Sequence, residues 1–62
     1  MDKVAFLNSQ ITCAMIEAMG MQARNKIELN KGMDIIYNQE DFLALIDKYG
    51  LGHNSVITYL ND

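Results

Sequence analysis

Several residue types are scarce or missing in this chain of 62 residues, and each absence excludes a class of protein. The single cysteine, Cys13, rules out a disulfide within the chain and is typical of a reducing compartment. With one histidine, one cysteine and acids that lack ligand spacing, the chain has no recognisable metal site. The sequence therefore predicts a protein that folds without a disulfide, a metal or another cofactor.

Positive charge and long apolar runs are also limited. Five Lys and Arg residues against eight Asp and Glu residues give a net charge of −3, which argues against binding to nucleic acid phosphates. The start MDKVAFLNSQ lacks the regions of a signal peptide, and no apolar run approaches the ~20 residues of a membrane span. Because half of the residues are hydrophobic, disorder is not expected. We expect a soluble, cytoplasmic protein that does not bind a membrane.

Helix-forming residues dominate the first half of the chain, and Gly32 is a suitable left-handed cap after residue 30. This composition predicts a helix over about 3–30, followed by a connector over 31–38. Apolar residues recur there at spacings of three and four, which indicates one buried stripe. The stripe consists of Val4, Leu7, Ile11, Ala14, Ala18 and Met21.

Two shorter helices are expected after the connector. Asn38 is the predicted N-cap of a helix over about 39–49, which Gly50 ends. His53, Asn54 or Ser55 is expected to cap a last helix over about 54–61. The inward residues predicted for the two helices are Phe42, Leu45, Ile46 and Tyr49, and Val56, Ile57 and Leu60. The fold class is thus all-α: a single domain over 1–62, with a long N-terminal helix packed by a helix-turn-helix-like corner.

The segment CAMIEAMGMQA, residues 13–23, is apolar around most of the expected helix. Two short helices cover only one side of it, and a chain of this size is marginally stable on its own. The sequence therefore predicts self-association into a homo-oligomer, and a groove for a different protein is the alternative. The expected oligomer interface comprises Ile11, Ala14, Met15, Ala18 and Met19.

No group of residues indicates catalysis, so we do not expect an enzyme. Cys13 and His53 are the only thiol and imidazole, and Cys13 is expected to be buried within the apolar helix and therefore inert. Polar residues that favour ligand or partner contacts occur around the end of the long helix and the last turn. These candidates are Arg24, Asn25, Lys26, Tyr37, His53 and Asn54. Solvation of the helix end for the basic residues, and capping for His53 and Asn54, is the simpler interpretation.

In size and composition the chain resembles the small accessory proteins of phages and mobile elements, which bind a host protein or capture a small ligand. This resemblance implies a homo-oligomeric binding module that inhibits a host protein or sequesters a small anionic, nucleotide-like ligand. A second resemblance is carried by FLALIDKYGLGHNSVITYLN, residues 42–61. With Gly50 at the turn, Leu51 after it and Val56 facing inward, this segment resembles a DNA-binding helix-turn-helix. A small DNA-binding regulator is therefore the alternative, although residues 53–62 contain no Lys or Arg.

Overall fold

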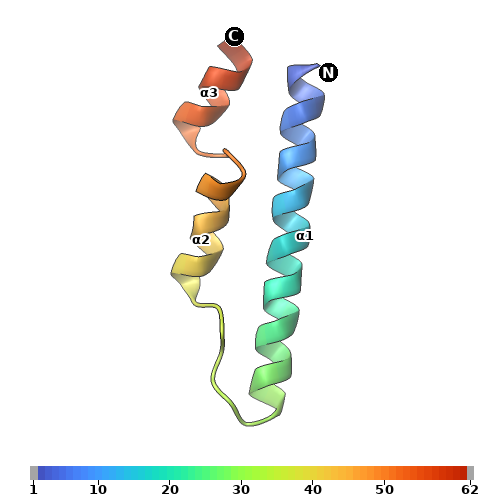
Figure 1. Cartoon of the computed structure of the whole chain (residues 1–62), viewed down its shortest axis with the longest axis vertical. Coiled ribbons are helices and arrows are strands. Elements are labelled where there is room, and N and C mark those ends of the chain that lie inside the picture. The colour runs from blue at the N-terminus through green and yellow to red at the C-terminus, as the bar shows by residue number, and fades with distance from the viewer. Residues whose placement is uncertain (1, 62) are drawn as a thin grey trace.

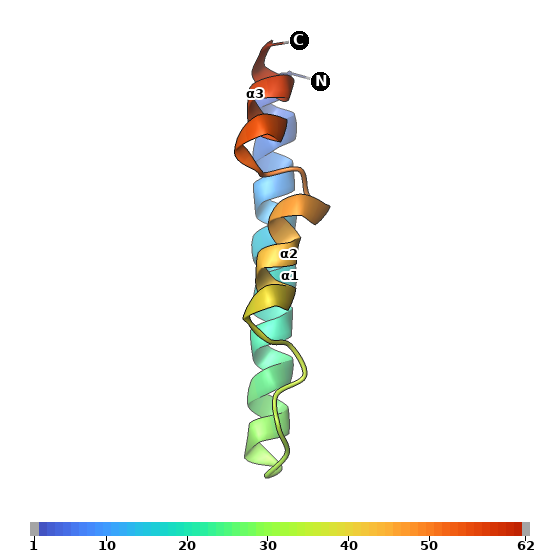
Figure 2. The ribbon, with the colours of Figure 1, turned by 90° about the vertical axis from the view of Figure 1, so that its left-hand side faces the viewer.

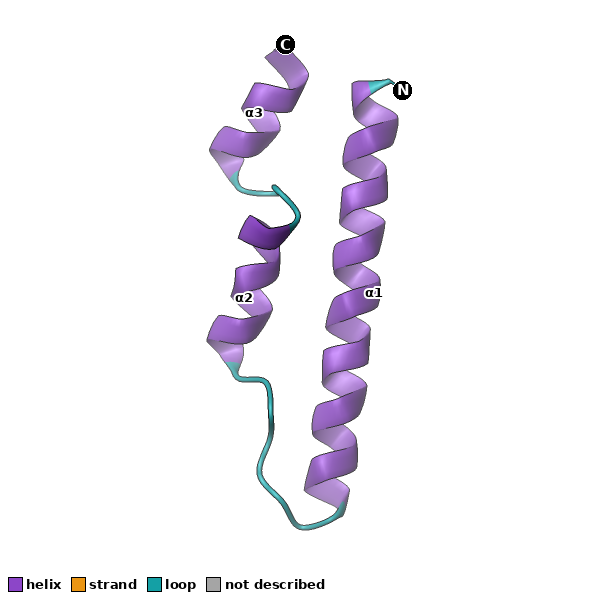
Figure 3. Ribbon diagram, viewed as in Figure 1, coloured by secondary structure: helices purple, strands orange, loops and turns teal. Residues whose placement is uncertain are grey.

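The computed structural model of the protein describes residues 2–61, apart from the side chain of Tyr59. Three helices follow one another in the order α1 (Lys3–Asn30), α2 (Gln39–Lys48) and α3 (His53–Asn61). Within the described residues there is no strand, and loops connect the helices (Figure 3). The predicted all-α fold, with one long N-terminal helix packed by a bent C-terminal pair, is confirmed.

Local hydrogen bonds explain where α1 begins and ends. Asp2 is the N-cap, and its carboxylate accepts hydrogen bonds from the backbone N–H groups of Val4, at 2.7 Å, and Ala5, at 3.2 Å. At the other end Gly32 has a φ of +78°, and the Met33 N–H donates to the Glu28 carbonyl. This pattern is a Schellman motif, and it ends α1 where the glycine was predicted to end it.

A side-chain cap and a Schellman motif also define the two ends of α2. The Asn38 side chain accepts a hydrogen bond from the Asp41 N–H, and the Asp41 carboxylate accepts one from the Asn38 N–H. This reciprocal pair is a capping box. Gly50 has a φ of +65°, and the Leu51 N–H donates to the Ile46 carbonyl at 2.7 Å. A second Schellman motif therefore ends α2.

The start of α3 differs from the prediction. His53 is already helical, and the Val56 N–H donates to the Gly52 carbonyl at 3.0 Å. His53, Asn54 and Ser55 therefore lie in the first turn of α3, and the prediction that one of them caps this helix is wrong. α3 begins two residues after Leu51, the last residue of the Schellman motif. Gly52 therefore occupies the position before the first turn, which His53, Asn54 or Ser55 was predicted to occupy.

The three helices form a flat layer that is one helix thick. α2 and α3 follow each other along one side of α1 and run antiparallel to it, so the two chain ends lie at the same end of the molecule (Figure 1). In the view from the side, α2 and α3 lie in front of the N-terminal part of α1, and the connector lies in front of its C-terminal turns (Figure 2). The extents of the Cα trace are 49 × 19 × 9 Å. Its radius of gyration is 14.6 Å, against about 10.6 Å for a compact domain of this length.

A flat layer buries few side chains. Among the described residues the buried hydrophobic side chains are Met21 and Leu45, which are 8% and 7% exposed. Leu7, Ala14, Ala18, Phe42, Tyr49 and Val56 are half-buried, as the predicted stripes require. The other residues predicted to face inward are exposed: Val4, Ile11, Ile46, Ile57 and Leu60. Their prediction is wrong for the single chain because α2 and α3 pack on one side of α1 and no second layer covers the flat sides.

Candidate interaction surface

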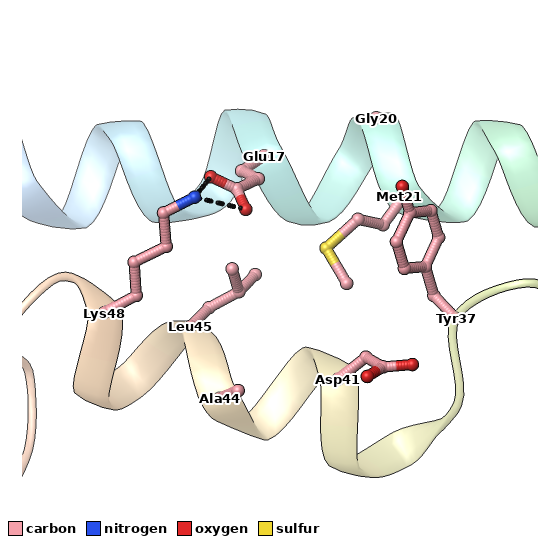
Figure 4. Close-up of a pocket in the computed structure, with 8 residues that line it drawn as sticks. All are labelled: Glu17, Gly20, Met21, Tyr37, Asp41, Ala44, Leu45 and Lys48. Carbon is pink, nitrogen blue, oxygen red and sulfur yellow. Dashed lines mark hydrogen bonds and ion pairs between the residues drawn. The ribbon is translucent and has the colours of Figure 1, made fainter.

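A group of polar side chains joins α2 to α1. The Lys48 ammonium donates to both carboxylate oxygens of Glu17, at 2.6 and 2.9 Å (Figure 4). The Tyr49 hydroxyl donates to the same carboxylate at 2.6 Å. Nearby, the Gln10 side-chain amide donates to the Tyr49 carbonyl at 3.2 Å. These contacts fix the register of α2 along α1.

Glu17, Lys48 and Tyr49 shift one another's pKa values. The hydrogen bond from Lys48, together with that from Tyr49, lowers the pKa of the Glu17 carboxyl below its ordinary value. The Glu17 carboxylate raises the pKa of the Lys48 ammonium and that of the Tyr49 hydroxyl. At neutral pH all three groups are therefore in the forms that make these contacts.

Asn25 fixes the connector between α1 and α2. Its side-chain oxygen accepts hydrogen bonds from the N–H groups of Ile36, at 3.0 Å, and Tyr37, at 2.9 Å. Its amide N–H donates to the Tyr37 carbonyl at 2.8 Å. The half-buried Asn25 side chain thus holds the backbone that returns from α1 to α2.

Two shallow open clefts lie between α1 and the segments beside it. One, of about 510 Å³, has Met21 and Leu45 at its base and is bordered by Glu17, Lys48 and Asp41 (Figure 4). The other, of about 420 Å³, is lined by Gln22, Asn25, Lys26, Leu29, Asn30, Ile35 and Phe42. Because residues of an α-helix are 100° apart, the α1 residues Gly20 and Gln22, which line different clefts, differ by about 160° around the helix. The two clefts therefore open on opposite flat sides of the molecule.

The side that carries the second cleft is the more apolar. On α1, Val4, Ile11 and Met15 are 18, 11 and 7 residues before Gln22, and Leu29 is 7 residues after it. These spacings are close to whole numbers of helical turns, so the side chains lie along the same edge of α1. On α2, Ile46 is one turn from Phe42. The members of this surface, which we call the apolar face, are Val4, Ile11, Met15, Leu29, Ile35 and Ile46. Each of these side chains is at least 40% exposed.

The predicted oligomer interface only partly coincides with the apolar face. Ile11 and Met15 belong to it, and Met19, which is 61% exposed, lies at its outer border one turn from Met15. Ala14 and Ala18 are half-buried against the neighbouring helices. Leu29 is absent from the predicted interface, although its spacing of 18 and 14 residues from Ile11 and Met15 places it on the same side of the helix. Ile35 could not be assigned to this face from the sequence, because the connector has no helical periodicity that would indicate the side on which a residue lies.

The predicted ligand contacts do not come together in one chain. The bond from Gln10 places Tyr49 beside the N-terminal part of α1, and His53 and Asn54 follow at that end. Arg24 is fourteen residues further along α1 than Gln10, which corresponds to about 21 Å. Asn25 and Tyr37 are in contact, whereas Arg24 and Lys26 lie about 160° apart around the same part of α1. His53 and Asn54 lie at the other end of the molecule.

The cations near the end of α1 are mostly paired. The Glu28 side chain, which is 13% exposed, forms ion pairs with Arg24 at 3.3 Å and with Lys31 at 3.7 Å. Within the described residues, Lys26 forms no salt bridge. Among the cations near the end of α1, Lys26, next to the second cleft, is therefore the one without an ion pair in the described part of the chain.

Cys13 is exposed, so the prediction that it is buried is wrong for the single chain. The reason is its position around α1. Cys13 is two residues from both Ile11 and Met15, and it therefore lies about 160° away from each of them. It is on the flank of α1 opposite the apolar face.

The C-terminal pair differs from a DNA-binding helix-turn-helix in its packing. In that motif two helices cross at about 90–120° around a short turn. Here α2 and α3 each pack on α1, and no contact between α2 and α3 is found in the described part of the chain. The segment over 42–61 is thus a bent continuation along α1 (Figure 1), and no observation on it favours DNA binding.

No family model, curated protein or solved structure matches the chain. None of the helices in the described residues has the length and apolar content needed to cross a bilayer. What the geometry itself defines is a thin helical layer with one strongly apolar side.

Proposed function

We propose that the protein is a non-catalytic binding module that acts by associating with another polypeptide through its apolar face. The observation that carries this proposal is the single-layer architecture, in which large side chains such as Met15 and Ile46 are exposed. Protein domains are normally built from two or more packed layers that enclose a core. A contiguous exposed apolar surface marks an interaction site.

The polar side chains support association over chemistry. Asn25 binds the backbone of the connector, and Asn38 and Asp41 cap α2. Glu17 binds Lys48 and Tyr49. Each of these side chains makes a contact that holds the fold together. This use of the polar groups supports binding through a surface rather than catalysis.

Of the two binding modes expected from the sequence, association with a polypeptide is favoured over capture of an anionic ligand. Such a ligand requires several converging cations or donors. Arg24 and Lys31 pair with Glu28, and His53 lies far from Arg24 along α1. The apolar face, in contrast, needs only a complementary apolar surface.

The proposal can be tested by affinity purification from cells of the source organism with three tagged versions of the chain. These are the wild type, Met15→Glu on the apolar face, and Ile16→Glu as the matched control. Met15 and Ile16 are 59% and 63% exposed, and both variants add the same charge. Ile16 is two residues from the half-buried Ala14 and Ala18, so it lies on the outer side of α1.

We expect the wild type and Ile16→Glu to retain the same polypeptide partner, and Met15→Glu to lose it. Circular dichroism of the purified variants checks that both remain helical. If all three versions retain the same polypeptides, or if none retains any, a co-expressed untagged copy of the chain included, the proposal is wrong.

A further inference from the structure

The structure points to a specific occupant of the apolar face: we propose that it is covered by the apolar face of a second copy of this chain. This inference rests on the proposed function and names its partner. The two flat layers then form a two-layer helical assembly, with Met15 and Ile46 of both chains in its interior.

The first argument is the area that the single chain leaves exposed. The accessible surface is 4747 Å², whereas a compact monomer of this mass exposes about 4,000 Å². The excess, about 700 Å², is close to the roughly 800 Å² that each partner buries in a stable interface of standard size. An interface of standard size would therefore bring the exposed surface of each chain down to that of a compact monomer of the same mass.

The second argument is the shape of the face. The layer measures 49 × 19 Å in its plane, so one flat side spans roughly 900 Å², which is enough for a standard interface. A flat side fits a second identical flat side along its whole length. A globular partner of another shape would cover only part of it.

The third argument is charge. A symmetric dimer brings the same surface of both chains together, and like charges placed opposite each other oppose association. The six residues that define the apolar face are uncharged, and the charged residue that lines the cleft on the same side is a cation, Lys26. The opposite flat side carries Glu17, Asp41 and Lys48 around its cleft, and Cys13 lies on that flank. The chain as a whole carries a net charge of −3, so the apolar face is the side that can self-associate without bringing carboxylates together.

The chain contains its own reporters for this interface. Met15 and Met33 are 59% and 60% exposed in the single chain, whereas Met21 is 8% exposed. Cys13 is exposed on the opposite flank. A dimer through the apolar face therefore covers Met15 and leaves Cys13 accessible.

The experiment uses the purified full chain alone. Light scattering gives its mass at several concentrations, and oxidation by hydrogen peroxide followed by peptide mass spectrometry gives the relative rates of Met15, Met21 and Met33. A thiol reagent reports on Cys13 under the same conditions. We expect about twice the single-chain mass of 7.0 kDa, oxidation of Met15 slowed at least about fivefold relative to Met33, and full labelling of Cys13.

The variants Met15→Glu and Ile16→Glu then locate the contact. The first should shift the mass towards one chain at micromolar concentration, and the second should leave the dimer intact. A single-chain mass at hundreds of micromolar for the wild type overturns the inference, and so does protection of Cys13 with Met15 freely oxidised. If the purified wild type is a monomer but its cellular partner depends on Met15, the proposed function stands and only the second copy is excluded.

Discussion

Asn25 is the residue on which the course of the chain after α1 depends most directly. Its side chain makes three hydrogen bonds to the backbone of Ile36 and Tyr37, at 2.8–3.0 Å. A backbone that leaves a helix needs partners for its N–H and C=O groups, and here one amide supplies them. This role explains why the Asn25 side chain is half-buried between α1 and the connector.

We therefore expect Asn25→Ala to destabilise the fold by about 1–3 kcal/mol, since three neutral hydrogen bonds are lost. Asn25→Asp should be similarly damaging, because a carboxylate cannot donate to the Tyr37 carbonyl. Urea unfolding followed by circular dichroism measures both. The control is Asn30→Ala at an exposed position of the same helix, which should change stability far less. Equal effects of Asn25→Ala and Asn30→Ala would contradict this role.

Gly20 has no local reason to be glycine. It lies inside α1, and a Cβ added there would have no neighbouring atom within 4 Å. Glycine in a helix interior costs about 0.5–1 kcal/mol relative to alanine. Gly20→Ala should therefore raise the free energy of unfolding by about that amount in thermal or urea melts. A decrease would indicate that another helix approaches Gly20 closely and would relocate the interface to that flank.

The contacts of Glu17 predict a specific dependence on pH. Because the pKa of Glu17 is lowered in the folded state, its ionised form stabilises the fold above the ordinary carboxyl pKa. That contribution disappears as the pH falls through the lowered folded-state pKa. Glu17→Gln should therefore lower the urea midpoint at pH 7, more at low than at high salt, and have little effect at pH 2. In the Glu17→Gln background, Lys48→Gln should add little. An effect of Glu17→Gln that is the same at both pH values would exclude the ionic role.

At the scale of the elements, the position of each helix end is determined by residues close to it in the sequence. Asp2, the Asn38–Asp41 pair and the two Schellman motifs use only residues within a few positions of each end. This is why the ends of α1 and the start of α2 agree with the prediction from the sequence. The start of α3 was predicted wrongly because Gly52 has no side chain that signals a cap.

The two glycines of the bend between α2 and α3 are expected to differ. Gly50 has a φ of +65°, where a side chain costs about 1–2 kcal/mol. Gly52 lies outside the left-handed region and has open space around the position of a Cβ. Gly50→Ala should lower the free energy of unfolding by about 1–2 kcal/mol, whereas Gly52→Ala should change it by less than about 0.5 kcal/mol. Similar losses at both positions, measured by urea unfolding, would show that the bend depends on more than backbone geometry.

At the scale of the whole molecule, the main feature is that the layer has almost no interior. Met21 and Leu45 are the buried hydrophobic side chains of the described residues, while fifteen large hydrophobic side chains are exposed. Hydrophobic burial provides most of the favourable free energy of folding, so a second layer should contribute much of the stability.

The stability should therefore depend on protein concentration. If folding and association are coupled, each tenfold increase in concentration adds about 1.4 kcal/mol per dimer, which raises the melting temperature by about 5 °C for two chains of this length. Thermal melts between about 2 and 200 µM measure this shift. Ile16→Glu should preserve the dependence and Met15→Glu should abolish it. A melting temperature of the wild type that is independent of concentration would mean that the layer is stable alone.

The sequence by itself determined the helical class, the extent of the helices and most of their ends, because these follow from composition and from contacts over a few residues. It also identified the apolar excess of residues 13–23. Periodicity placed Ala14, Ala18 and Met21 on the inner side correctly, and only the tertiary structure decided how much of α1 is covered. The bonds from Lys48 to Glu17 and from Asn25 to the connector, which join residues distant in the sequence, hold the rest of the chain along one side of α1. Because nothing in the single chain packs on the flat sides, Ile11 and Met15 stay exposed.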